Sequence, residues 1–295
     1  MSAVRSPVLS GTWYPDDPAR LRREVDAFLA DAVAADRPRG RPLIAVVPHA
    51  GYLYSGATAG RLYGLLRDAA PRRVVILAPN HRVPLRRLAL SGAAAYATPL
   101  GEVAVDTAAV DRLAASPAFA VDDSAHAEEH AVEIQLPLLQ RTWPEAVPRI
   151  VPVLVPRLEP AVVRAAAAAL GEVLDAGTLL LVSTDLTHYG RSFGYVPFTD
   201  DVPAALEQLD AGAILKVLAG DPAGLRAFGE RTGITMCGLE AAALALETGL
   251  PAGYEGALLD YRRSGDRDGD YSVSVSYAAV LLCSGEPADA AGRAP

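Results

Sequence analysis

The chain has 295 residues, of which 51% are hydrophobic and 21% charged. This composition supports a large apolar core and excludes a disordered or fibrous protein. The net charge of −8, without a basic stripe, argues against a nucleic-acid partner, and no run approaches the roughly 18 apolar residues that a membrane span needs.

The first predicted strand is the apolar run at residues 43–47, which a helical pattern follows at residues 57–68. The same alternation recurs along the chain. Further strands are expected at residues 73–77, 150–155 and 178–182, and further helices at residues 107–115, 128–140, 159–175, 203–218 and 238–246. Near the end, residues 272–276 alternate with period two before the apolar run 277–282, which predicts an antiparallel strand.

Buried strands that alternate with helices indicate the α/β fold class. We expect a single domain, residues 1–284, in which a central mixed, mostly parallel sheet carries helices on both faces. The tail at residues 285–295 is expected to be disordered. The first residues lack the apolar stretch of a secretory signal and two cysteines cannot form a disulfide framework, so we expect a cytoplasmic protein.

Three of the five histidines follow predicted strands. His49 comes after the first strand, His81 after the second, and Asp185 and His188 after the strand at residues 178–182. Ligands of open α/β sheets bind beyond the carboxyl ends of the strands. Because imidazole is both a common metal ligand and a general acid or base, this pattern favours a metal site with proton transfer over three separate packing residues.

Cys237 lies immediately before the predicted helix at residues 238–246. At a helix N-terminus a thiolate is stabilised by the helix dipole, which favours a ligand or a nucleophile. The alternative, a small buried apolar residue, has equal weight from the motif alone. Cys283 lies in the apolar C-terminal run and is expected in the core.

The segment from His126 to His130 matches the H-x-x-E-H pattern of inverted zinc proteases. The pattern is short, and no distinct third ligand follows it. We therefore keep the protease as an alternative. We expect Glu128, Glu129 and His130 to line the rim near the other histidines, and His126 to lie at the surface. Tyr54 is a further candidate for the cleft.

Several motifs together resemble one known family, the MEMO family, whose prokaryotic members are called AmmeMemoRadiSam system protein B. They run in order from residue 11 to residue 278. The motifs are Gly11-Thr-Trp-Tyr-Pro15, Pro48-His-Ala-Gly-Tyr-Leu-Tyr-Ser-Gly56, Thr98-Pro-Leu-Gly101, Glu129-His-Ala-Val-Glu133, Ser183-Thr-Asp-Leu-Thr-His-Tyr-Gly190, Ile234-Thr-Met-Cys-Gly238 and Val275-Ser-Tyr-Ala278. The family's fold is similar to that of LigB-type class III extradiol dioxygenases, which are non-haem iron enzymes.

The resemblance implies a metal held by His49, His81 and Cys237, with the thiolate where the dioxygenases place a carboxylate. It also implies that His188 is the catalytic acid or base, with Asp185 beside it. Fe(II) is the expected metal, and a thiolate also admits copper or zinc.

The expected substrate contacts and ligand supports are Tyr54, Arg82, Glu129 and His130. Arg82 is a departure from the family pattern, which has two adjacent histidines where this chain has His81 and Arg82. A spare ligand is thereby lost, and an anionic substrate group is favoured.

Three functions compete. The first is a metal-dependent, dioxygenase-like redox enzyme with a small-molecule substrate. The second is a non-catalytic scaffold whose cleft holds a peptide, since eukaryotic relatives are described as adaptors for phosphotyrosine peptides, with Arg82 and Arg86 as anion contacts. The third is the zinc protease. The family name also implies a radical-SAM protein of the same system as a partner.

Overall fold

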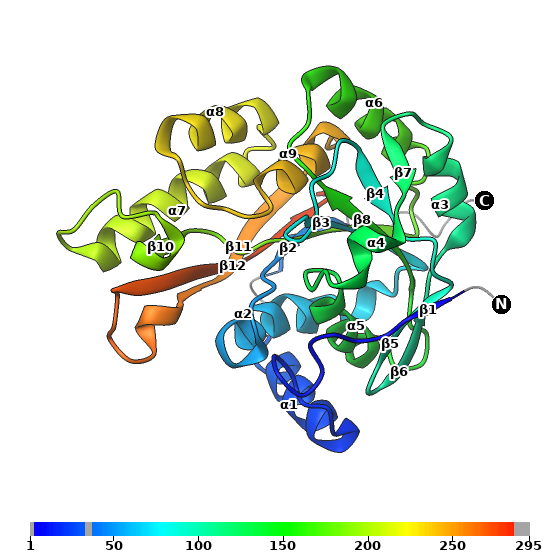
Figure 1. Ribbon diagram of the computed structural model, residues 1–295, viewed down its shortest axis with the longest axis horizontal. Coiled ribbons are helices and arrows are strands. Elements are labelled where there is room, and N and C mark those ends of the chain that lie inside the picture. Colours follow the sequence, from blue (N-terminus) through cyan, green and yellow to red (C-terminus); the bar gives the residue numbers. More distant parts are fainter. Residues whose placement is uncertain (1–2, 33–36, 286–295) are drawn as a thin grey trace.

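In the computed structural model, which describes residues 3–32 and 37–285, a mixed sheet of nine strands runs through the molecule (Figure 1). The strand order is β10-β12-β2-β9-β3-β8-β4-β7, and β11 pairs with β12 as well. The strands are β2 (Pro42–Val47), β3 (Arg73–Pro79), β4 (Leu88–Leu90), β7 (Phe119–Val121), β8 (Arg149–Val155), β9 (Thr178–Ser183), β10 (His188–Gly190), β11 (Glu255–Arg263) and β12 (Val273–Cys283).

The four central strands β2, β9, β3 and β8 are all parallel, and antiparallel pairings flank them. Their valine, isoleucine and leucine side chains are almost entirely buried, as expected for strands that are covered on both faces. Strand β12 pairs antiparallel with β2, which confirms the antiparallel strand predicted near the end of the chain.

Helices cover both faces of this sheet (Figure 1). One face carries α1 (Pro18–Ala30), α2 (Tyr52–Leu65) and α5 (Leu136–Thr142). The other carries α6 (Pro160–Gly171), α7 (Val202–Leu218), α8 (Pro222–Thr232) and α9 (Leu239–Glu247). Two short helices, α3 (Thr107–Ala114) and α4 (Asp123–Ala127), pack near β7 and β4. The α/β fold class with helices on both faces is therefore confirmed.

A small second sheet joins the N-terminal strand β1 (Val4–Arg5) to the hairpin β5 (Ala95–Thr98) and β6 (Gly101–Ala104). Helix α1, which the apolar pattern did not predict, packs closely against α2. A Cβ at Gly60 would lie 2.4 Å from the Cβ of Phe28, so only glycine permits this approach. The packing fixes α2, which begins three residues after His49, the first predicted site residue.

The helix predicted at residues 128–140 is confirmed only in its second half. Helix α4 ends at Ala127, residues 128–132 are irregular, and a 3₁₀ turn at Glu133–Gln135 leads into α5. The Glu129 carboxylate accepts the N–H groups of His130 and Ala131, and a side chain that bonds nearby backbone in this way competes with the helix.

Helix α8 and strand β11 were also not predicted. Among the described residues, none of the helices combines the length and the apolar character that crossing a bilayer requires. Most of the predicted disordered tail, residues 286–295, lies outside the described residues.

Candidate metal centre

The loops after three neighbouring parallel strands form the floor of the site. Strand β9 lies between β2 and β3, so the carboxyl ends of all three meet at one edge. The loop after β2 carries His49, the loop after β3 carries His81, and the loop after β9 carries Asp185. A backbone hydrogen bond of 2.8 Å from Thr184 N to Val47 O holds two of these loops together.

Within the described residues, one group of side chains is arranged so that it could hold a metal ion: His49, His81 and His130. One ligand atom from each lies within 4.8 Å of the others. The rings of His81 and His130 are stacked with centroids 4.7 Å apart, and His49 lies edge-on to both at 5.4 Å. His49 and His130 are buried, whereas His81 faces solvent, which leaves an approach to the cluster.

Cys237 lies outside that group but against one of its members. Its Sγ is 3.2 Å from His49 Nε2. The approach depends on Gly238, because a Cβ there would lie 2.5 Å from the Cβ of Thr184, and Gly238 N instead donates to Thr184 Oγ1 at 2.8 Å. The start of α9 thus reaches the end of β9, and the thiol faces Nε2 of His49.

Asp185 holds the loop that carries His49. Its Oδ1 accepts the backbone N–H of His49 at 2.8 Å, and its Oδ2 lies 4.0 Å from His49 Nε2. Burial raises the pKa of Asp185, against the opposing effect of His188 and of the N–H groups of His49 and Ala50. The Asp185 carboxylate therefore interacts electrostatically with both His49 and His188.

Burial determines the protonation of the donors. It lowers the pKa of His49 to about 3, with the charge of His81 adding to the effect, and the pKa of His130 to about 4. Burial, together with the charge of Asp185, raises the pKa of the Cys237 thiol to about 12. In the absence of a metal, burial thus favours the protonated thiol, and the role of Cys237 as a ligand stays a prediction.

Glu129 orients two of the histidines. Its carboxylate accepts from His81 Nδ1 at 3.0 Å and from the backbone N–H groups of His81 and His130, both at 2.8 Å. Burial opposes ionisation, but these bonds and the charge of His81 lower the pKa of Glu129 to about 2. A carboxylate that accepts from Nδ1 leaves Nε2 of His81 as the free donor atom, as in many metal sites.

His188 lies outside the three-histidine cluster. Its Nδ1 is 3.1 Å from the carbonyl oxygens of Leu186 and Thr235, so Nδ1 carries the proton and Nε2 is the free nitrogen. Thr235 Oγ1 also accepts the backbone N–H of His188 at 2.8 Å. The ring is thereby held in one tautomer.

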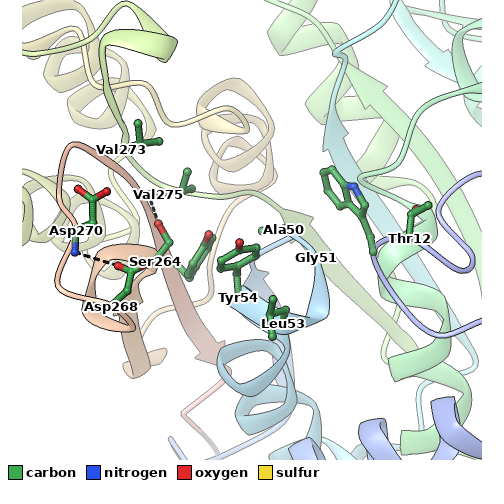
Figure 2. Close-up of a pocket in the computed structure, with 12 residues that line it drawn as sticks. Thr12, Ala50, Gly51, Leu53, Tyr54, Ser264, Asp268, Asp270, Val273 and Val275 are labelled. Atoms are coloured by element: carbon green, nitrogen blue, oxygen red, sulfur yellow. Dashed lines mark hydrogen bonds between the residues drawn. The ribbon is translucent and has the colours of Figure 1, made fainter.

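A cavity of about 560 Å³ adjoins the cluster. Ala50 and Gly51, which follow His49, line it, and the ring of Trp13 lies 4.8 Å from that of His130. Figure 2 shows Thr12 on one side, Asp268 and Asp270 on the opposite side, and Tyr54 between them. The remaining lining residues are Leu53, Ser264, Val273, Val275 and Tyr277.

The predicted residues outside the cluster divide into two groups. Tyr54 lines the cavity and is 48% exposed. Arg82 and Arg86 are exposed and do not line it, and Arg82 Nε donates to Glu128 O at 3.2 Å. Cys237 itself lines a second cavity of about 320 Å³, whose lining residues also include Asn80 and Arg226.

His126 is buried, so its predicted surface position is wrong. Its Nδ1 lies 3.0 Å from the Tyr96 hydroxyl and its Nε2 lies 3.1 Å from Ala89 O. Both ring nitrogens therefore point away from the cluster that contains His130, and the two histidines of the H-x-x-E-H pattern do not share a site.

Sequence reasoning missed two features of the site. His130 was expected only at the rim, because the predicted helix concealed the turn that brings it beside His49 and His81. Trp13 comes from the N-terminal segment, far from any predicted strand end. Its position next to His130 had no signal in the strand and helix pattern.

Comparisons with known proteins agree with the motif resemblance. A family model described as "Memo-like protein" matches residues 5–281. The chain is 35% identical to a MEMO1 family protein of Methanopyrus kandleri over 94% of this chain and 98% of that protein. It is 34% identical to a MEMO1 family protein of Thermococcus onnurineus, covering 95% and 99% of the two chains. Among solved structures, an uncharacterized protein from Escherichia coli K12 matches with a TM-score of 0.49 at 15% identity, covering 82% of this chain and 100% of that one.

Proposed function

Because the chain belongs to the family of Memo-like proteins, we propose that it is a metal-dependent enzyme that acts on a small molecule in the cavity beside the histidine cluster. The observation that carries the proposal is the convergence of three imidazoles within 4.8 Å, with the Cys237 thiol 3.2 Å from His49. The inferred location, the cytoplasm, is part of the same proposal.

The donor set fits a transition metal. His130 Nδ1 is buried and makes no hydrogen bond, although it lies 3.2 Å from Glu129 Oε1. A buried nitrogen without a hydrogen bond is available to coordinate a metal ion. Imidazole and thiolate together suit Fe(II), copper or zinc, and we propose Fe(II). His49, His81 and Cys237 would hold the ion, with His130 as the alternative third ligand. A bound Fe(II) would supply redox chemistry at an open coordination position.

The protein's own groups supply positioning and proton transfer. His188 Nε2 is the nitrogen available to take or give a proton, since Nδ1 is held by two carbonyls. Asp185 fixes the backbone of His49, and Glu129 fixes the ring of His81. Trp13 and Tyr54, which line the cavity, would pack their rings against the substrate.

The competing function is a non-catalytic binding protein that uses the same cavity for a peptide. The exposed side chains of Leu53 and Tyr54 at the cavity favour it, at 64% and 48% exposure. Against it, Arg82 and Arg86, the expected anion contacts, do not line the cavity, whereas Asp268 and Asp270 do. A radical-SAM protein of the same system is the proposed protein partner in either case.

The test is metal analysis of protein purified without oxygen, followed by oxygen-consumption assays with candidate substrates. We expect bound transition metal in the wild type and its loss in His49→Ala. His126→Ala is the matched control, because His126 is a buried histidine of the same region whose nitrogens face away from the cluster. Metal that persists in His49→Ala would refute the site, and metal lost only in His126→Ala would favour the zinc protease.

A further inference from the structure

A buried ion pair joins the N-terminal segment to the segment that carries two of the site residues. Arg5 Nη1 bonds the carboxylate of Glu133, and the two side chains are only 7% and 0% exposed. The same guanidinium donates from Nη2 to Glu129 O at 2.7 Å and from Nε to His126 O at 3.2 Å. Arg5 therefore holds residues 126–133 at three points, two backbone carbonyl oxygens and one side-chain carboxylate.

Glu133 in turn gathers the rest of the N-terminal arm, by which we mean residues 5–14. Its carboxylate accepts the backbone N–H groups of Val8 and Leu9, both at 2.9 Å, and the hydroxyl of Tyr14 at 2.6 Å. Trp13 lies between these contacts and places its ring 4.8 Å from His130. One carboxylate thus fixes the arm that forms a wall of the cavity.

The segment held in this way carries Glu129, which accepts from His81 Nδ1, and His130 itself. Removing two charges from water is expensive, so a buried pair seldom adds much stability; its attested use is to fix one arrangement. Groups that support metal ligands without touching the metal change metal affinity by about 10–100-fold. The Arg5–Glu133 pair contacts the irregular segment at residues 128–132, so it is placed to fix the conformation of that segment.

We propose that Glu133 is a positioning residue of the metal centre: through Arg5 and the arm it sets the geometry of His81 and His130 without contacting the metal. The inference rests on the proposed function, because it requires that the cluster binds a metal. It also accounts for the Glu129–Glu133 motif, of which only the first two residues take part in the site directly.

The test uses Co(II) as the probe in the full chain, with Glu133→Gln compared to wild type. Glutamine keeps the shape but leaves Arg5 with an unpaired buried charge. We expect Co(II) affinity to fall about 10–100-fold and the visible Co(II) spectrum to shift. Asp106→Asn is the matched control, because it breaks the partly buried Arg73–Asp106 pair at the opposite end of β3. It should lower the thermal midpoint and leave the spectrum unchanged.

Wild-type affinity and spectrum in Glu133→Gln would overturn the inference, even if its thermal midpoint fell as far as that of Asp106→Asn. If Glu133→Gln does not fold, Tyr14→Phe removes one donor from Glu133 and keeps the ion pair. Tyr14→Phe should also weaken Co(II) binding, but less than Glu133→Gln does. An unchanged spectrum and affinity in Tyr14→Phe would overturn the inference. Wild-type protein that binds no Co(II) would instead refute the proposed function.

Discussion

If Cys237 is a metal ligand, metal binding must release its proton, and this makes a prediction about pH. The thiol has a pKa raised to about 12, whereas His49 and His130, with pKa values lowered to about 3 and about 4, are already neutral at pH 6–8. A protein group that is protonated when free and deprotonated when bound makes affinity rise with pH.

The size of this pH effect on metal affinity follows from the same pKa values. At pH 7 the thiol lies about five pH units below its pKa, so about one molecule in 10⁵ carries the thiolate before the metal arrives. Throughout pH 6–8 each unit of pH should therefore raise the apparent metal affinity about tenfold through Cys237 alone. In Cys237→Ser this contribution disappears, so the slope of log affinity against pH should fall by one relative to wild type.

The assay is a Co(II) competition titration at several pH values, combined with direct measurement of proton release. The two proteins share every other titrating group, so the difference in slope isolates the thiol. Equal slopes in wild type and Cys237→Ser would refute the reasoning and would leave His49, His81 and His130 as the ligand set.

Two other changes test the packing around the site: one at Gly238, and one at Asp210, a buried carboxylate that accepts from Thr187, the residue before His188. Gly238→Ala places a Cβ 2.5 Å from that of Thr184, so we expect a loss of about 1–3 kcal/mol in unfolding free energy and weaker metal binding, measured by urea unfolding and titration. Gly171→Ala, with nothing within 4 Å of the new Cβ, is the control and should not destabilise; equal effects of the two would contradict the close approach. Asp210→Ala leaves buried donors of the Thr187 and Tyr261 side chains without their acceptor, and should cost about 3 kcal/mol or more, whereas Tyr261→Phe should cost less. Similar losses from both would show that the carboxylate is not the centre of that network.

The rule that ligands of open α/β sheets bind beyond the carboxyl ends of the strands predicts the part of the site that local sequence controls. Buried apolar runs define β2, β3 and β9, and the rule then places His49, His81 and Asp185 at one edge, where the structure has them. These residues are predictable because each lies within a few positions of a strand whose location is evident from composition alone.

The remaining residues depend on tertiary contacts. His130 reaches the cluster because Glu129 breaks the expected helix by bonding the backbone around it, and the same carboxylate also bonds His81, 48 positions away. Trp13 is held through Glu133, which lies more than a hundred positions away in the chain. No periodicity in the sequence records either contact, so these positions required the structure.

The most direct test of the central claim is a crystal structure of the metal-loaded protein with anomalous diffraction at the metal's absorption edge. We predict one anomalous peak at the ends of β2 and β3, bonded to His49 and His81 and to Cys237 or His130. A fully loaded crystal whose only peak lies away from His49 and His81 would contradict the account.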